Sequence, residues 1–174
     1  KIADYLIKPI NPSQILLSVK KLLQNKQLID ERTTQSYQQD FMNISMAFGD
    51  AEDHQDWADI YRKLTYWEMQ IDDTENKNML PVLESQKIEA NANFCRFIKE
   101  NYLDWMEEKN PTKPLLSYQV MKKKVFPQLQ EKKPLFFIVI DNFRLDQWED
   151  IESIIAPYFN IKDKDTYYSI LPTT

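Results

Sequence analysis

Apolar residues recur at helical spacing through the middle of the chain, from about residue 26 to residue 109. Three stripes follow the i, i+3, i+4, i+7 pattern that marks the buried face of an amphipathic helix. They consist of Tyr37, Phe41, Ile44 and Phe48; of Trp57, Ile60, Tyr61, Leu64, Trp67 and Ile71; and of Ile88, Ala92, Cys95, Ile98, Tyr102, Trp105 and Met106. Because Gly49-Asp50 and the segment DDTENKN separate the stripes, the pattern predicts a compact antiparallel three-helix bundle over residues 26–112.

A strand, a turn and a helix are predicted before the bundle, over residues 1–25. The strand lies around Tyr5 to Ile7, and Lys8-Pro9 forms the turn. Asn11 is a favourable N-cap for the helix that follows it. The apolar positions of that helix are Ile15, Leu16, Val19, Leu22 and Leu23.

The last part of the chain, residues 113–174, combines helical and strand-like patterns. A helix is predicted from Ser117 to Gln130, after the proline-rich linker NPTKP. The run from Leu135 to Ile140 is apolar at every position. Such runs are typical of strands in parallel sheets, which are covered on both faces.

A second helix and a second strand follow this run. The helix covers residues 146–158, and the strand lies within TYYSILPTT. The order strand, helix, strand predicts a βαβ unit. Ligands collect beyond the carboxyl ends of such strands, and Asp141 and Thr173-Thr174 are expected to lie together at that edge. The inward residues of the helix are expected to be Trp148, Ile151, Ile154 and Ile155.

The glycine content sharpens the prediction of fold class. One Gly occurs in 174 residues, although hairpins and phosphate-binding loops depend on Gly for positive φ angles. The chain is therefore predicted to be mainly α, with a partial α/β sheet. A Walker loop and a dinucleotide-binding fingerprint are both excluded.

Charge and hydropathy limit the partners. The net charge of -5 gives no basic footprint of the kind that nucleic-acid-binding domains carry, which counts against a DNA-binding output. Lys122, Lys123 and Lys124 are expected to form a solvated helix face. No apolar run approaches the length of a membrane span, and a cytoplasmic location is expected.

Two candidate sites in the bundle have simple structural explanations. His54, Asp53 and Asp56 could be imagined as metal ligands, but acidic residues at the start of a helix favour its macrodipole. Cys95 lies within an apolar stripe and has no His nearby in the sequence. It is interpreted as a small core residue rather than a nucleophile.

The segment DYLIKPINPSQILLSV resembles the last strand and last helix of response-regulator receiver domains. In that family the lysine of the Lys-Pro pair contacts the phosphoryl group, and Lys8 matches it. The resemblance implies a histidine kinase as partner. It also implies a magnesium-binding pocket, whose residues and phosphoacceptor Asp would lie upstream of residue 1.

The segment FFIVIDNFRLDQW, followed by YYSILPTT, resembles the start of a PglZ domain, a branch of the alkaline phosphatase superfamily. The resemblance implies that Asp141 binds a divalent metal, normally zinc. The family pattern Pro-Thr-x-Thr places the nucleophile on its second threonine. Pro172-Thr173-Thr174 fill the first three places, so the nucleophile is either the residue after the chain or, if the register shifts by one, Thr174.

The three parts occur in the order found in PorX-type response regulators. This resemblance implies dimerisation on phosphorylation, a zinc-dependent phosphodiesterase that acts on oligonucleotides, regulation of type IX secretion, and a possible sigma-factor partner. Asn142 and Arg144 would orient substrate phosphate or simply form a turn, and Asp146 is expected to cap the next helix.

The sequence is expected to be an inactive fragment of such a regulator. It starts without Met and contains one His, whereas a two-zinc site needs several His and Asp ligands. The alternative is a non-catalytic helical module for dimerisation or protein docking, in which the sheet only covers the bundle.

Overall fold

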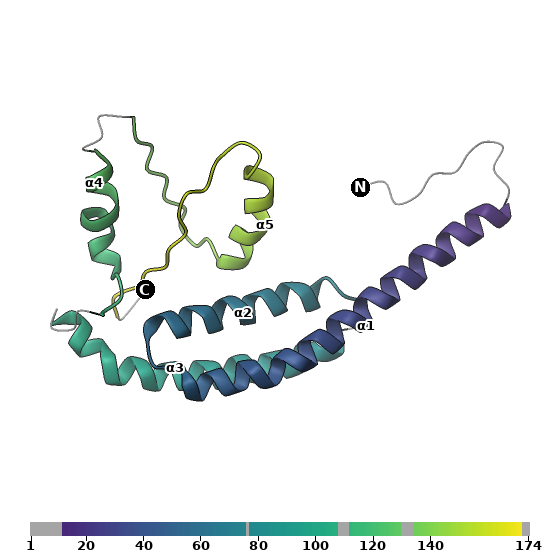
Figure 1. The fold of residues 1–174 in the computed structure, drawn as a ribbon, viewed down its shortest axis with the longest axis horizontal. Helices are drawn as coiled ribbons and strands as arrows, with labels where there is room; N and C mark the ends of the chain where they lie inside the picture. Colours follow the sequence, from purple (N-terminus) through teal and green to yellow (C-terminus); the bar gives the residue numbers. More distant parts are fainter. Residues whose placement is uncertain (1–11, 76, 108–111, 130–133, 172–174) are drawn as a thin grey trace.

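The computed structural model describes residues 12–75, 77–107, 112–129 and 134–171. Three long helices, α1 (Pro12–Asp50), α2 (His54–Asp72) and α3 (Leu80–Met106), pack together as consecutive antiparallel elements (Figure 1). The short 3-10 helix η1 (Lys77–Met79) leads into α3. The predicted, mainly helical fold and its central three-helix bundle are therefore confirmed.

Shorter elements follow the bundle. They are the 3-10 helix η2 (Ser117–Gln119), the π-helix η3 (Met121–Val125), and the α-helices α4 (Phe126–Leu129) and α5 (Leu145–Ile155). The helix predicted after the NPTKP linker thus forms as three short pieces in succession. Lys122, Lys123 and Lys124 are all exposed, as expected, and Lys124 also forms an ion pair of 2.6 Å with Asp165.

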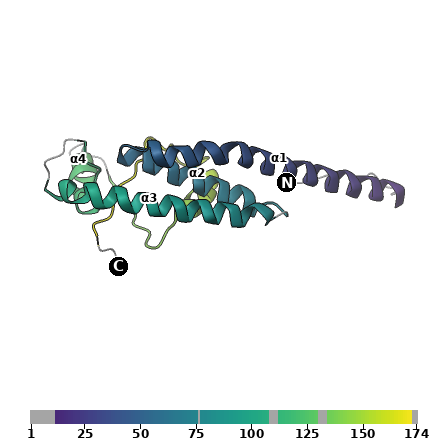
Figure 2. The same cartoon turned by 90° about the horizontal axis from the view of Figure 1, so that it is seen from below.

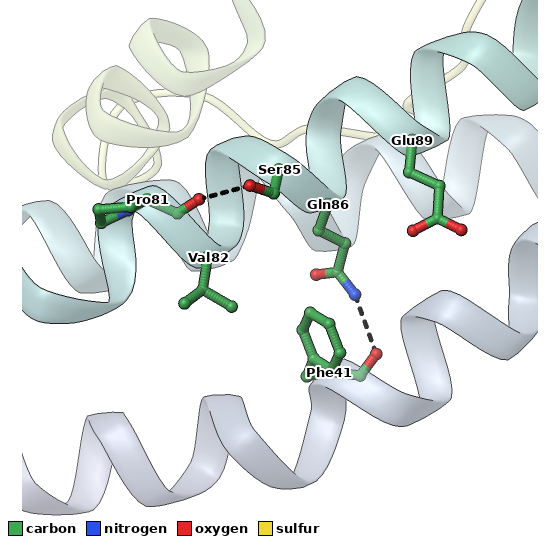
Figure 3. A pocket seen from close by; sticks show the side chains of 6 residues that line it. All are labelled: Phe41, Pro81, Val82, Ser85, Gln86 and Glu89. Atoms are coloured by element: carbon green, nitrogen blue, oxygen red, sulfur yellow. Dashed lines mark hydrogen bonds between the residues drawn. The ribbon is translucent and has the colours of Figure 1, made fainter.

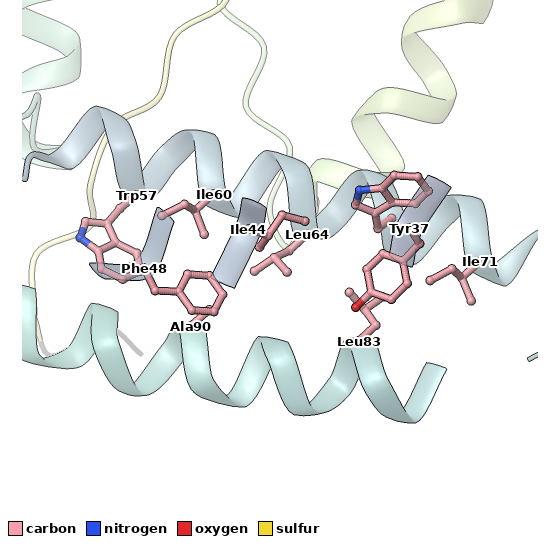
Figure 4. Packing of buried hydrophobic residues seen from close by; sticks show 10 residues of the cluster. Tyr37, Ile44, Phe48, Trp57, Ile60, Leu64, Ile71, Leu83 and Ala90 are labelled. Carbon is pink, nitrogen blue, oxygen red and sulfur yellow. The ribbon is translucent and has the colours of Figure 1, made fainter. Parts of the chain in front are cut away.

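The core of the protein lies inside the bundle, between α1, α2 and α3 (Figure 4). The stripe predicted on α1 is buried or partly buried throughout, and the stripe on α2 is buried except for Tyr61. Ring contacts tie the helices together, such as Tyr37 of α1 against Trp67 of α2, with ring centroids 5.4 Å apart. The cluster consists of Tyr37, Ile44, Phe48, Trp57, Ile60, Leu64, Trp67, Ile71, Leu83 and Ala90.

The stripe predicted on α3 lies mostly on the wrong face. Ile88 is 72% exposed and Cys95 is exposed, so the interpretation of Cys95 as a core residue is wrong. The residues of α3 that face the core are Leu83, Gln86, Ala90, Phe94 and Phe97. Trp105, which belongs to the predicted stripe, is buried as expected and packs against Phe97. The prediction missed this face because its residues include Gln86, and a search for apolar positions does not count a glutamine.

Gln86 is buried because its amide group is fully engaged between α1 and α3. Its Oε1 accepts a hydrogen bond of 3.0 Å from the Tyr37 hydroxyl. Its Nε2 donates to the Phe41 carbonyl at 2.9 Å, as Figure 3 shows. The same Nε2 also donates to Ser45 Oγ at 2.9 Å. A buried amide without partners would cost about 1–3 kcal/mol, so this network favours one register of α1 against α3.

Helix α1 continues without a break through the expected boundary at residues 25 and 26. Its N-terminal half extends beyond the other two helices, as Figures 1 and 2 show, and leaves side chains such as Leu16 and Leu17 exposed. From Lys26 onward α1 is tied to the bundle, because Lys26 pairs with Glu75 at 2.5 Å. The predicted strand near Tyr5, the lysine Lys8 and the cap Asn11 lie outside the described residues.

The structure does not confirm the predicted partial sheet. Leu135 to Ile140 belong to no strand, and their side chains are exposed, with Phe136 at 87%. Within the described ranges, the isolated bridge that forms is a parallel one between Leu116 and Tyr168. A strand needs a neighbour to satisfy its backbone hydrogen bonds, and the described residues supply none to residues 135–140.

Helix α5 also differs from the prediction. It begins at Leu145 and ends at Ile155, three residues before the expected end. None of its residues is fully buried; Trp148 and Ile155 are half-buried, whereas Ile151 and Ile154 are exposed. Helix α5 contacts α2, but this contact covers its expected inward face only in part.

Hydropathy gives one further result. Across the four described ranges, no helix has both the length and the apolar character needed to cross a membrane.

Candidate functional site

A cleft of about 870 Å³ lies between the bundle and the C-terminal region. One wall comes from α2 and α3, and the other from the start of α5 and from residues 166–168. The walls carry aromatic side chains, which include Trp57, Tyr61, Phe94, Tyr167 and Tyr168, and also three cationic ones, Arg62, Lys87 and Arg144.

The cations of the cleft are already neutralised by neighbouring carboxylates. Lys87 pairs with Glu68 at 2.7 Å, and Arg62 pairs with Asp59 at 2.5 Å. Arg144 binds Asp146 through two hydrogen bonds of 2.9 and 2.5 Å. The cleft therefore offers mixed polarity rather than a concentrated positive charge.

The Arg144–Asp146 pair also changes the interpretation of Asp146. The hydrogen bonds from the guanidinium group lower the pKa of Asp146 to about 2. The N-cap position of α5 is occupied by Arg144, whose backbone N–H donates to Gln147 Oε1 at 3.1 Å. The prediction that Asp146 caps this helix is therefore wrong in position, although Asp146 lies in the first turn, where a carboxylate is favourable.

Asp141, the predicted metal ligand, lies in an exposed turn directly before α5. Its Oδ1 accepts a hydrogen bond of 2.9 Å from the backbone N–H of Asn142. Asn142 has a φ of 55°, the left-handed conformation that asparagine tolerates in turns. The role of Asn142 as a turn residue follows directly, whereas metal binding by Asp141 stays a prediction.

The remaining predicted site residues cannot be placed. Thr174, the candidate nucleophile, and Lys8, the candidate phosphoryl contact, both lie outside the described residues. Within the described parts of the chain, no group of three or more His, Cys, Asp or Glu side chains is arranged to hold a metal ion. A zinc site is therefore not assembled among these residues, and Asp141 fits one only as a single carboxylate ligand.

The acidic segment around His54 is explained by helix capping. Asp53 Oδ1 accepts hydrogen bonds from the backbone N–H groups of Gln55, at 2.7 Å, and Asp56, at 3.0 Å. Asp56 Oδ2 accepts in return from the backbone of Asp53 at 3.2 Å, which completes a capping box. The interpretation of these residues as a favourable helix N-terminus, rather than a metal site, agrees with this geometry.

An aromatic cluster at the same end of the bundle was not predicted from the sequence. Trp105 packs against Phe97 at 5.7 Å and against Tyr168 at 5.5 Å between ring centroids. Tyr168 also contacts the rings of His54 and Phe94. Tyr168 is 114 positions from His54 in the sequence, and no local pattern marks such a contact. Only the aromatic content of both segments could have suggested it.

Taken together, the contacts define the central region as a three-helix bundle. It carries a long helix that projects at one end and holds a C-terminal segment at the other (Figure 1). Residues 27–106 match the family described as the PorX response regulator linker domain. The bundle is thus similar to the linker of PorX response regulators, which supports the resemblance of the chain to that family. No curated protein matched the chain.

Proposed function

We propose that this chain is the central part of a PorX-like response regulator, in which the bundle links a receiver domain to a zinc-dependent phosphodiesterase of the PglZ type. The observation that carries the proposal is the match of residues 27–106 to the PorX linker domain. A linker of this family is expected to lie between an input domain and an output domain.

The sequences on both sides of the bundle support the proposal. DYLIKPINPSQILLSV before it resembles the end of a receiver domain, and FFIVIDNFRLDQW after it resembles the start of a PglZ domain. Helix α1 joins the first of these segments to the bundle without a break from Pro12 onward. A continuous helix is a rigid connection, suited to carrying a change in the receiver into the bundle.

The proposed activity would use Asp141 as one metal ligand and a threonine at or just after Thr174 as the nucleophile. Zinc, when bound, would neutralise the phosphodiester oxygens and lower the pKa of the attacking hydroxyl. The exposed carboxylate of Asp141 is held in a fixed turn by Asn142, which suits a ligand that projects from the chain. The chain alone is proposed to be inactive.

The partners follow from the same proposal. A histidine kinase would phosphorylate the receiver, which requires magnesium, and phosphorylation would promote a homodimer. The substrate would be an oligonucleotide, and the regulated process type IX secretion, with a sigma factor as a possible further partner.

The test compares Asp141→Ala with Asp146→Ala in the full-length protein. Loss of an outer-sphere partner typically costs about 10–100-fold in metal affinity or activity, so loss of a direct ligand should cost more than about 100-fold. We expect Asp141→Ala to lose bound zinc and hydrolysis of a synthetic phosphodiester, whereas the neighbouring acid Asp146 can be replaced with little effect. Unchanged zinc content and turnover in Asp141→Ala would overturn the assignment.

A second candidate function is a non-catalytic dimerisation or docking module. Exposed apolar side chains favour it, both on the projecting part of α1, as at Leu16, and in the segment around Phe136. Such surfaces commonly contact other proteins. A full-length protein that binds no zinc but changes its oligomeric state when residues of α1 are replaced would favour this function.

A further inference from the structure

We propose that Tyr168 is a structural link between the start of α2 and residues 165–171. Through this link, a displacement of α1 and α2 is transmitted to this C-terminal segment. The proposal rests on contacts between described residues and does not depend on zinc binding or hydrolysis. It assigns to the bundle a conformational role in addition to that of a spacer.

The backbone of Tyr168 is hydrogen-bonded to residues 115 and 117, which follow the proline-rich segment NPTKP. Its N–H donates to the Leu115 carbonyl at 2.8 Å, and its carbonyl accepts from the N–H of Ser117, also at 2.8 Å. Leu116, between these two partners, is completely buried. The position of Tyr168 along the chain is therefore set by two hydrogen bonds and by the burial of its neighbour.

The side chain of Tyr168 reaches the first residue of α2. Its hydroxyl donates a hydrogen bond of 2.6 Å to the backbone carbonyl of His54. Its ring packs against the rings of His54 and Trp105, with centroids 6.0 and 5.5 Å away. Burial raises the pKa of Tyr168 to about 12, so the hydroxyl keeps the proton that it donates.

The carbonyl that accepts this bond is placed by the cap of α2. His54 follows the N-cap Asp53, whose side chain holds the first turn through the N–H groups of Gln55 and Asp56. When a cap is removed, the first turn of a helix frays. The bond from Tyr168 is then expected to weaken, because its acceptor is no longer fixed.

Helix α1 is joined to the N-terminus of α2 by a short connection. Three residues, 51–53, separate α1 from α2. The N–H groups of Glu52 and Asp53 both donate to Asp56 Oδ2, at 2.9 and 3.2 Å. With 39 residues, α1 is about 58 Å long at 1.5 Å per residue. A tilt of its projecting end would therefore move the start of α2, and with it the partner of Tyr168.

Residues 165–171 have further contacts on either side of Tyr168. The N–H of Leu171 donates to the Tyr102 hydroxyl of α3 at 2.6 Å. Asp165 pairs with Lys124 at 2.6 Å. Of these contacts, Tyr168 is the one that links the segment to α2, and Tyr102 links it to α3. Residues 165–171 therefore contact both α2 and α3, and a change in the relative position of these helices should displace them.

The first experiment measures amide hydrogen exchange after the cap of α2 is removed. We expect Asp53→Ala to accelerate exchange at residues 166–171 by roughly fivefold, the factor that corresponds to a typical cap. The matched control is Asp59→Ala, which removes an exposed carboxylate from the same helix and should leave these residues unchanged. Equal exchange at residues 166–171 in Asp53→Ala and the unmodified chain would overturn the proposal.

The second experiment changes Tyr168 itself and measures the effect on the start of α2. Tyr168→Phe, which removes only the hydrogen bond, and Tyr168→Ala, which also removes the ring, should accelerate exchange at residues 54–57, with the larger effect for Ala. Tyr158→Ala serves as control, because Tyr158 is 82% exposed. Combining Asp53→Ala with Tyr168→Ala should add little beyond the single changes at residues 166–171, since both break the same link.

Two results would contradict the proposed link between Tyr168 and α2. Fully additive effects in the double variant would mean that the cap and Tyr168 act independently. Acceleration by Tyr168→Phe that extends equally to the far end of the bundle, around Leu83, would mean that Tyr168 supports the whole fold rather than a local link.

Discussion

The bundle and the region from residue 134 to residue 171 are both rich in apolar side chains, yet they bury them very differently. In the bundle, ten residues from three helices form one buried cluster. Among residues 134–171 no side chain is fully buried, although this region includes the most continuous apolar run of the chain. An apolar run therefore becomes a core only where a second apolar face lies opposite to it.

The two regions also differ in how they are attached to the rest of the chain. Helices α2, α3 and the C-terminal half of α1 contact one another, and a buried polar network at Gln86 joins α1 to α3. The C-terminal region is attached through the contact of α5 with α2 and through the hydrogen bonds of Tyr168 and Leu171. Packing in the first region is distributed over three helices, whereas the second region is attached through fewer residues.

The largest expected difference between the two regions is in hydrogen exchange. Amides in the middle of α2, around Leu64, are expected to open only with a free energy near that of global unfolding, whereas residues 135–140 have no strand partner in the described chain. With a global stability of at least about 5 kcal/mol, α2 should exchange nearly four orders of magnitude more slowly than residues 136–140, relative to their intrinsic rates, at about 1.4 kcal/mol for each factor of ten. Mass spectrometry of exchange time courses measures this directly.

The projecting part of α1 provides a case between these two. Residues 16–23 form helical hydrogen bonds but lack tertiary packing, so their exchange should lie between those of α2 and of residues 136–140. Protection at residues 136–140 equal to that of α2 would show that this run is covered after all, and the comparison would fail.

The sequence predicts local faces better than long-range contacts. The stripes on α1 and α2 were predicted because their buried residues are apolar and evenly spaced, as at Ile44 and Phe48. The face of α3 was missed because a hydrogen-bonded glutamine, Gln86, occupies its centre. Tyr168 was assigned to a strand because it lies in an alternating segment, whereas the structure uses it to contact α2 and α3.

For the candidate site, the sequence supplied residue types but not their surroundings. Asp141 follows the apolar run in the sequence itself, and its predicted role as a metal ligand stays a prediction. Its expected neighbours at the edge of a sheet depend on strand pairing, which is not formed among the described residues. The ion pair between Arg144 and Asp146 was missed because each residue was assigned a separate role.

A smaller effect is expected from replacing one core residue of the bundle. Ile71 is 1% exposed, and Ile71→Ala should lower the free energy of unfolding by about 2–5 kcal/mol, because it removes buried methyl groups and leaves a cavity. The matched control is Ile88→Ala, which should cost less than about 0.5 kcal/mol because Ile88 lies on the exposed face of α3. Urea denaturation followed by circular dichroism measures both. Equal losses would mean that the inward face of α3 is the one predicted by its apolar pattern.

The smallest expected effect concerns the surface of the C-terminal region. Arg144→Ala removes the hydrogen bonds that hold the pKa of Asp146 at about 2, so this pKa should rise toward the ordinary value of 3.8. Carboxyl carbon chemical shifts followed by NMR during an acid titration report the change. Arg62→Ala is the matched control, since Arg62 lines the same cleft but pairs with Asp59. Because Arg144 is exposed, unfolding by urea at neutral pH should change little. A large loss of stability in Arg144→Ala would show that the C-terminal region is held by more than its few contacts with the bundle.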